Sequence, residues 1–373
     1  MVPSVDHTYL SLKPDYQSLT VQALDLVREQ IQGGVWGNAL PSERKLAASL
    51  QVSRKTVRKI LAQLRTEGLV SLQGKRNLIT GAEGREPRRP KVRVGLLLSQ
   101  PLERMRPFAL LWINHLMALL QESGHPLEIF HGHKYYGMHP EKTLERLVAE
   151  NPATFWIIGT SNRVLQNWFQ KAGVPVIIAG SAHQGIHLPS VDLDHRAQAR
   201  HAATHLLRAG HRRLALFLAQ GDAAGDAECE EGFREGIAGF PATAFPPLVY
   251  RVDSQRQSMV NALHRALTTA PPATALLLSS PLSYLTAVSY LGSVGKRVPA
   301  DISLLSCKEE PFFSHLHPSP AYYTVSPAKF AAVLHRTLRK EIQGGTETGQ
   351  AVRIMPELVP GETIRQMKPI LVS

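Results

Sequence analysis

Apolar residues recur at helical spacing in the first quarter of the chain. One stripe repeats at i, i+3, i+4 and i+7 and predicts a helix with one buried face: Val57, Ile60, Leu61 and Leu64. A shorter apolar set predicts a helix just before it: Leu46, Ala47 and Leu50. Another set predicts a supporting helix over residues 20–32: Val21, Leu24, Val27 and Ile31. Three short amphipathic helices indicate a small helical domain at this end of the chain.

Polar residues mark where the two later helices begin, and a hairpin pattern follows them. Ser42 and Ser53 stand at the helix starts, where a hydroxyl oxygen can accept hydrogen bonds from free backbone N–H groups. Residues 69–72 and 77–80 read as two short strands around a glycine-containing basic turn at residues 74–76. The pattern therefore predicts two helices joined by a tight turn and followed by a hairpin with a basic tip.

From Val92 onward, the pattern changes to short, continuously apolar runs separated by amphipathic segments. These runs predict strands over residues 92–98, 127–130, 154–159, 174–179, 213–219, 248–252, 274–279 and 302–306. Helices are expected to begin between them, near Pro107, Pro140, Arg163, His195, Ala227, Ser254, Leu282 and Pro327. Strands that are apolar throughout are typical of parallel sheets covered on both faces. Either a (β/α)8 barrel or two doubly wound lobes fits this number of units.

Positive charge is concentrated at the helical end of the chain. The 373 residues carry a net charge of +12, from 42 Lys+Arg and 30 Asp+Glu. Residues 1–91 hold 15 of these cations and 8 of the anions, a net charge of +7. On the helix with the longer apolar stripe, the cations lie off that stripe: Arg54, Lys55, Arg58 and Lys59. The asymmetry indicates a polyanion partner, and cations at the start of the second of two turn-linked helices are typical of a DNA recognition helix.

The stretch from Pro41 to Thr80 resembles the winged helix-turn-helix of the GntR family of bacterial transcription regulators. It contains PSER-x-LA, a turn, SR-x-TVR, EGLV and a glycine-containing wing, and the resemblance covers residues 16–80. Arg76 departs from the family, which usually has a second wing glycine at that position. The resemblance implies that the following residues contact DNA: Ser42, Arg44, Ser53, Arg54, Lys55, Thr56, Arg58, Gly74, Lys75 and Arg76.

Two strings in the larger part of the chain resemble the effector-binding domain of the LacI/GalR regulators. They are residues 189–216 and 274–305, with weaker matches at residues 106–108, 320–325 and 357–359. That domain shares its fold with periplasmic sugar-binding proteins, in which two Rossmann-like lobes joined by three crossing strands surround a ligand cleft. The resemblance therefore favours two lobes over the barrel.

Together the two resemblances divide the chain in the manner of arabinose-type repressors of GntR descent. We expect a flexible tail over residues 1–15, a winged helix-turn-helix domain over 16–81 and a linker over 82–91. An effector-binding and dimerisation domain is expected over residues 92–373, and its lobe boundaries are 92–192 and 326–354 for lobe one, and 193–325 and 355–373 for lobe two. The expected fold class is α/β, with the winged helix preceding two lobes of doubly wound parallel sheets.

The positions that bind ligand in the LacI/GalR family are largely altered in this chain. Cys229 stands where the family has an Arg, three residues before the Gly-aromatic pair Gly232-Phe233. Ser280-Pro281 replaces the family's Asn-Asp. Both changes remove planar, bidentate groups, which suit sugar hydroxyls because each hydroxyl both donates and accepts.

Two further pairs complete the predicted cleft. Lys308-Glu309 replaces Asp-Asp, and Asp194-His195 retains only the Asp of the family's Asp-Asn. An acidic group could pair with Lys308 and with His195, so we expect an effector that carries a carboxylate, a phosphate or another substituent rather than a plain neutral monosaccharide. The candidate effector-binding residues are Ser99, Phe108, Thr160, Asp194, His195, Cys229, Phe233, Ser280, Lys308 and Glu309.

The remaining sequence indicates neither a metal site nor a cofactor. The pairs His131-x-His133 and His315-x-His317 could each offer two metal ligands, but no Cys or carboxylate is spaced with either pair. No Gly-x-Gly-x-x-Gly or phosphate-binding loop follows the first apolar strand. Two cysteines and the lack of a basic segment followed by an apolar run indicate a cytoplasmic protein.

These patterns favour a ligand-responsive transcription regulator, with repression of carbohydrate-related genes as the expected activity. It would dimerise through its effector domain and bind an inverted-repeat operator. One alternative is a constitutive dimeric DNA-binding protein whose cleft binds nothing. A second alternative is an enzyme fused to a DNA-binding domain, as in GntR proteins with a transaminase-like half. The sequence shows no nucleophile elbow, paired catalytic carboxylates or Schiff-base lysine context, which disfavours the enzyme.

Overall fold

A computed structural model of the chain describes residues 19–32, 35–36, 38–50, 52–74, 76–80, 92–152, 154–240, 245–343 and 350–367. The chain forms two compact units, residues 1–90 and 91–373. The expected tail over 1–15 and linker over 82–91 lie outside the described residues, as does Lys75.

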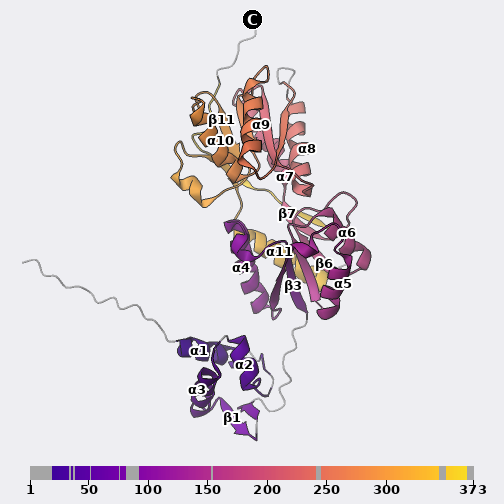
Figure 1. Ribbon diagram of the computed structural model, residues 1–373, viewed down its shortest axis with the longest axis vertical. Coiled ribbons are helices and arrows are strands. Elements are labelled where there is room, and N and C mark those ends of the chain that lie inside the picture. Colours follow the sequence, from indigo (N-terminus) through magenta and orange to yellow (C-terminus); the bar gives the residue numbers. More distant parts are fainter. Residues whose placement is uncertain are drawn as a thin grey trace, which may run out of the picture. The chain divides into compact units, whose positions relative to one another are not determined.

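The first unit is the predicted winged helix-turn-helix (Figure 1). Its elements are α1 (Leu19–Gln32), α2 (Glu43–Ser49), α3 (Arg54–Thr66), β1 (Val70–Gln73) and β2 (Arg76–Ile79). The two strands pair antiparallel and form the wing. Ser42 caps α2 and Ser53 caps α3, each side chain accepting a hydrogen bond from the backbone N–H three residues later. Both predicted caps are confirmed.

The predicted apolar stripe of α3 forms the centre of this unit's core. Its side chains are at most 2% exposed: Val57, Ile60, Leu61 and Leu64. The prediction for α1 needs one correction, because Val21 is 40% exposed while Ala23 is buried. The buried face of α1 therefore runs through residues 23, 24, 27 and 31.

The second unit contains two six-stranded sheets, which define lobe one and lobe two. In lobe one the order is β13-β7-β6-β5-β3-β4, built from β3 (Arg93–Leu98), β4 (Leu127–His131), β5 (Thr154–Gly159), β6 (Val176–Ala179), β7 (Ser190–Leu193) and β13 (Ala351–Ile354). In lobe two the order is β14-β12-β11-β10-β8-β9, built from β8 (Leu214–Ala219), β9 (Leu248–Val252), β10 (Ala275–Leu278), β11 (Ser303–Ser306), β12 (Ala321–Thr324) and β14 (Glu357–Val359). Every pairing within these sheets is parallel except that of β12 with β14. The two doubly wound lobes are confirmed, and the barrel alternative is wrong.

Helices flank each sheet and begin at or within three residues of the predicted starts. Lobe one contains α4 (Pro107–Glu122), α5 (Glu141–Glu150), α6 (Arg163–Ala172), α11 (Pro327–Ile342) and the 3-10 helices η1 (Leu102–Arg104) and η2 (His133–Tyr135). Lobe two contains α7 (His195–Arg208), α8 (Ala224–Ala238), α9 (Arg256–Thr268), α10 (Pro281–Ser293) and η3 (Pro311–His315). In Figure 1, α11 lies with α4 in lobe one although most of lobe two separates them in the sequence, and the two helices pack together.

The chain passes between the lobes after β7, after β12 and after β13. These crossings lie at the carboxyl ends of parallel strands, where ligands bind in open α/β sheets. The ends of β3, β5 and β6 therefore face the junction in lobe one, and those of β8, β10 and β11 face it in lobe two.

Close packing of α7 against α8 fixes the wall that lobe two contributes to this junction. A Cβ atom on Gly232 would lie 1.9 Å from the carbonyl oxygen of Arg196, so only glycine fits there. A Cβ atom on Gly225 would lie 2.8 Å from the ring of His195. The first turn of α8 consequently stands directly against His195.

Candidate DNA-binding face and ligand cleft

The first turns of α3 carry the cations that were predicted to contact DNA. Arg54, Lys55 and Arg58 are exposed, while the apolar stripe of the helix is buried. Across the described residues, no hydrogen bond or ion pair holds the side chain of Arg54 or of Lys55. The Nε of Arg58 donates to Oε2 of Glu43 at 3.0 Å, in an exposed ion pair. Exposed pairs of this kind are weak, so Arg58 can exchange Glu43 for a phosphate or a base.

Hydroxyl groups stand at the N-termini of both helices of the motif. The Oγ of Ser53 accepts from the backbone N–H of Thr56 at 3.1 Å and lies 2.9 Å from the Thr56 hydroxyl. Ser42 has the corresponding place before α2, and Arg44 is exposed in the first turn of that helix. The N-terminus of a helix attracts anions, because its backbone N–H groups are free and its dipole is positive there.

The wing is attached to α3 by side-chain hydrogen bonds. The Oδ1 of Asn77, which is 9% exposed, accepts from Nε and Nη2 of Arg65 at 3.2 and 2.6 Å. At the tip, Gly74 has a φ of 60°, and β1 and β2 bring Gln73 opposite Arg76. Arg76 is exposed, so the wing presents a cation beside a turn that glycine adopts without strain.

A cavity of about 750 Å³ lies between the two lobes of the second unit. Its volume falls in the range of small-molecule sites, roughly 300–1,000 Å³. Of the ten candidate effector-binding residues, the following line it: Phe108, Thr160, His195, Lys308 and Glu309. Thr160 has a φ of 47°, an unusual backbone conformation for a β-branched residue and one that is often found at functional sites.

The structure assigns other roles to four of the remaining candidates. Asp194 does not line the cavity, because its Oδ1 accepts from the backbone N–H of Ala197 at 2.8 Å and caps α7. Cys229 and Phe233 are 4% and 0% exposed, since they share the face of α8 that packs into the core of lobe two. Ser280 stands at the N-cap of α10 and does not line the cavity either.

Ser99 does not line the cavity, but its Oγ lies 3.3 Å from the hydroxyl of Thr160, which does line it.

The thiol of Cys229 lies against that of Cys307. Its hydrogen bond with Cys307 and its burial raise the pKa of Cys229 well above the ordinary value. A thiol in this state is unreactive, and Cys229 is a core residue.

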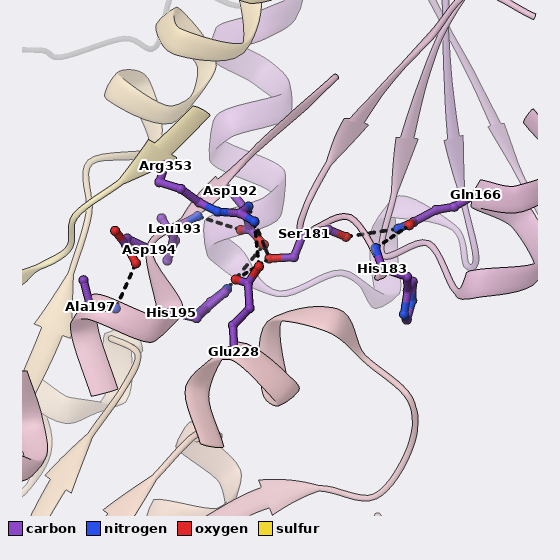
Figure 2. A network of polar contacts seen from close by, with 10 residues as sticks. All are labelled: Gln166, Ser181, His183, Asp192, Leu193, Asp194, His195, Ala197, Glu228 and Arg353. Atoms are coloured by element: carbon purple, nitrogen blue, oxygen red, sulfur yellow. Dashed lines mark hydrogen bonds and ion pairs between the residues drawn. The ribbon is translucent and has the colours of Figure 1, made fainter. Parts of the chain in front are cut away.

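A network of charged and polar side chains, of which only His195 was among the predicted site residues, joins the lobes beside the cavity (Figure 2). The Nη2 of Arg353, on β13, lies 2.6 Å from Oε1 of Glu228, on α8. The Oγ of Ser181 lies 2.9 Å from Oδ2 of Asp192 and 3.0 Å from Oε2 of Glu228. The Nε2 of His195 lies 3.3 Å from the same Asp192 oxygen. Glu228 and His195 come from lobe two and the other three from lobe one, so the network holds the lobes together.

The two carboxylates of this network have pKa values shifted in opposite directions. Burial raises the pKa of Asp192, but the charge of His195 and hydrogen bonds from His195, Leu193 N and Ser181 outweigh burial, so the pKa lies below its ordinary value. For Glu228, burial outweighs the charge of Arg353 and the hydrogen bond from Ser181, so the pKa lies above its ordinary value. Asp192 is therefore the firmly ionised member of the network.

Two other arginine ion pairs cross between the lobes in the described part of the chain. The Nε of Arg106, at the start of α4, lies 2.6 Å from Oε1 of Glu310, and Arg106 also donates to the carbonyl oxygen of Glu309. The Nε of Arg163, on α6, lies 3.6 Å from Oδ2 of Asp222. Arg106, Glu309 and Glu310 all line the cavity.

The two histidine pairs do not gather further ligands. The structure contains no cluster of three or more His, Cys, Asp or Glu residues that could hold a metal ion, among the residues it describes. A search of the same residues finds no helix with the length and hydrophobicity needed to cross a membrane.

Comparisons with known proteins identify both units. Residues 19–77 match the gntR family of bacterial regulatory proteins, and residues 203–364 match the periplasmic binding protein-like domain. The HTH-type transcriptional regulator CelR of Thermobifida fusca is 27% identical over 198 residues, which cover 52% of this chain and 57% of the relative. The match thus spans little more than half the length of that protein.

Solved structures share the fold of the second unit. A complex of transcriptional regulator CelR with cellobiose has a TM-score of 0.62 at 21% identity, covering 87% of this chain and all of that chain. A putative LacI regulator from Bacillus cereus subsp. cytotoxis has a TM-score of 0.63 at 18% identity, covering 74% and 99%. A LacI family regulator from Enterococcus faecium with bound ribose has a TM-score of 0.59 at 16% identity, covering 74% and 100%. The chain thus joins a winged helix-turn-helix unit that matches the gntR family model to a two-lobed unit that matches the periplasmic binding protein-like domain.

Proposed function

We propose that the protein is a sequence-specific bacterial transcription regulator that acts in the cytoplasm as a repressor of carbohydrate-related genes. The observation that carries the proposal is the first turn of α3, where Arg54 and Lys55 are exposed and have no hydrogen-bond or ion-pair partner among the residues that the structure describes. Free cations at a capped helix N-terminus can enter the major groove without first breaking an ion pair.

A small molecule in the cleft modulates DNA binding in this proposal. The cavity between the lobes supports this, as do two structural relatives, one a regulator in complex with cellobiose and the other a regulator with bound ribose. A ligand that prefers one arrangement of the lobes shifts the equilibrium between arrangements by its difference in affinity for them. Closure of the lobes would then change the spacing of the two recognition helices in a dimer.

The protein binds DNA as a homodimer in this proposal, and its operator is an inverted repeat. One winged helix contacts too few base pairs to find a single site in a genome, whereas two related by a twofold axis double the length of sequence recognised. Sedimentation of the full chain at micromolar concentration should therefore show a dimer.

Selection of bound duplexes from a random DNA library tests the proposal. The expected result is an enriched inverted repeat, which the protein binds in a fluorescence-anisotropy titration with an affinity that falls steeply as salt rises. Failure to enrich any sequence would contradict the assignment.

A second candidate function is constitutive DNA binding, in which the cleft has only a structural role and binds no effector. The ion pairs Arg106–Glu310 and Arg353–Glu228 favour it, because they join the lobes through the protein's own side chains. Adding small molecules to the DNA titration separates the two functions. An effector changes the operator affinity of a ligand-responsive regulator, and no compound changes that of a constitutive protein.

A further inference from the structure

The cavity between the lobes has two chemically different halves. Its polar half lies at the carboxyl ends of the strands and contains Thr160, Ser181, Asp192, His195, Asp226 and Lys308. Its apolar half is formed mainly by lobe one, by residues that follow η1, lie on α4, follow β12 or lie on α11: Met105, Phe108, Leu111, Trp112, Val325 and Phe330. A ligand that fills the cavity would meet both kinds of surface.

Most polar groups of the cavity are already bonded to each other. Asp192 is held by Ser181 and His195, and Arg106 by Glu310. Within the described part of the chain, no hydrogen bond or ion pair engages the Asp226 carboxylate or the Lys308 ammonium. The polar half therefore keeps only a few free groups, enough for a small hydroxylated head group.

The apolar half is a wall of aromatic rings. The ring of Phe330 packs edge-on against Phe108 at a centroid distance of 5.8 Å and tilts against Trp112 at 5.4 Å. Phe330 and Trp112 are nearly buried, whereas Phe108 is only partly buried and Leu111 is 49% exposed. These rings are thus held in place by one another while Phe108 and Leu111 offer apolar surface to the cavity.

A fully polar ligand would leave much of this wall in contact with water. Water against apolar surface is displaced favourably by an apolar group, and an aromatic group adds edge-to-face contacts with Phe108. The cavity volume of about 750 Å³ suits a drug-sized ligand better than a single sugar ring. The wall is also continuous with the polar half, so one molecule can occupy both.

We propose that the effector is amphiphilic, with a hydroxylated head group at the strand ends and an apolar, preferably aromatic, substituent against Phe108, Trp112 and Phe330. Glycosides with an aromatic aglycone are the chemical class that this arrangement fits. The inference rests on the proposed function, because it takes the cleft to be the effector site.

Matched pairs of methyl and phenyl β-glycosides of glucose, galactose and xylose test the proposal on the full chain by isothermal titration calorimetry. Both members of a pair share the head group and differ only in the apolar substituent. In at least one pair the phenyl member should bind at least tenfold more tightly, with a more negative heat-capacity change than its methyl partner. Equal affinities within every pair, or no binding by any member, would overturn the proposal.

Variants of Phe108 locate the apolar contact. Phe108→Ala should weaken binding of the phenyl member about tenfold and leave the methyl member nearly unchanged. Phe108→Leu keeps an apolar side chain and should retain part of the difference. Phe245→Ala is the matched control, because it removes a 43% exposed ring of lobe two that does not line the cavity. Equal weakening of both members by Phe108→Ala, or loss of phenyl binding in Phe245→Ala, would contradict the assignment of the wall.

Parallel measurements on the same samples separate this inference from the proposed function. If DNA selection yields an operator but no phenyl glycoside is preferred, the proposed regulator function is supported and the proposal of an amphiphilic effector is wrong. If phenyl glycosides bind through Phe108 but no DNA sequence is selected, the proposed ligand class of the cleft is supported and the proposed regulator function is wrong. A shift from dimer to monomer in Phe108→Ala during sedimentation would show that a second copy of the chain covers the wall, and this too would overturn the inference.

Discussion

The cations of α3 and the charged residues of the cleft differ in their surroundings. Arg54 and Lys55 are exposed and unpaired within the described residues, whereas in the cleft Arg106, Arg353 and His195 face carboxylates 2.6–3.3 Å away. Unpaired cations favour binding to a polyanion such as DNA, because the polyanion releases its counterions when the complex forms. Paired charges favour one arrangement of the lobes, and a ligand must compete with that arrangement or fit within it. The two regions therefore suit different tasks, attraction of DNA in one and control of shape in the other.

The same difference decides what could be predicted from the sequence. The DNA-binding face lies on one helix, one cap and one hairpin, so residues close in the sequence are close in space. The apolar stripe, Ser42, Ser53 and the position of the wing were all predictable for this reason. The α-helices of the second unit and eight of the twelve strands in its two sheets followed from their own local patterns in the same way, whereas the short strands β7, β12, β13 and β14 were not predicted.

The cleft network could not be predicted, because its members come from separate parts of the chain. Ser181 follows β6, Asp192 lies on β7, Glu228 on α8 and Arg353 on β13. Apart from His195, which the resemblance had indicated, only Asp192 carried a local signal. It lies two residues before Asp194 at the end of a strand, and in the structure it lines the cavity while Asp194 caps α7. The apolar character of the wall was also hidden, since Phe108 and Phe330 are far apart in sequence.

The two units are expected to fold independently, and the largest expected effect tests this. Leu64→Ala empties a fully buried position of α3 and should destabilise the first unit by about 2–5 kcal/mol. Differential scanning calorimetry of the full chain should show only the transition of that unit moving to lower temperature. Leu116→Ala, at a fully buried position of α4, is the matched variant for the second unit. The assumption fails if either variant moves both transitions together.

The role of the free cations in base recognition gives the next largest effect. Arg54→Ala should remove about 1–3 kcal/mol of discrimination between operator and scrambled DNA, the contribution of a bidentate Arg–guanine contact. Lys59→Ala removes the same charge from an exposed position of the same helix and should weaken binding to both duplexes alike. Anisotropy titrations at fixed salt provide the measurement. An equal loss on both duplexes in Arg54→Ala would place that residue on phosphates instead.

The paired charges of the cleft predict a smaller, pH-dependent effect on stability. The pKa of Asp192 is lowered in the folded state, so its contribution is present above the unfolded pKa and is lost as pH falls through the folded one. The pKa of Glu228 is raised, so its contribution is lost as pH rises through the folded pKa. At pH 7, Asp192→Asn should lower the free energy of unfolding by about 1 kcal/mol, the typical net contribution of one hydrogen bond, and Glu228→Gln should not lower it.

Urea unfolding of the second unit from pH 4.5 to pH 8 provides this measurement. The free-energy difference between Glu228→Gln and the unchanged protein should move in favour of the variant as pH rises. Asp192→Asn should remain destabilising over the same range, because Asp192 is ionised throughout. A variant difference for Glu228 that does not depend on pH would show that its carboxylate is not penalised by burial.

The smallest expected effect concerns the one cavity cation without a partner in the described chain, Lys308. An acidic effector was expected to pair with both Lys308 and His195, but His195 already faces Asp192. Four carboxylates also line the cavity, those of Asp192, Asp226, Glu309 and Glu310, and they oppose a second negative charge. The preference for an acidic ligand should therefore depend on Lys308 alone and contribute about 0.2–1 kcal/mol to the binding free energy, as for a partly solvated ion pair.

The measurement compares the affinities of phenyl β-glucuronide and phenyl β-glucoside for the unchanged protein and for Lys308→Met. Lys296→Met is the control, because Lys296 is exposed and lies outside the cavity. Lys308→Met should weaken only the glucuronide, by two- to fivefold, and an equal affinity of the unchanged protein for both glycosides would show that its effector need not be acidic.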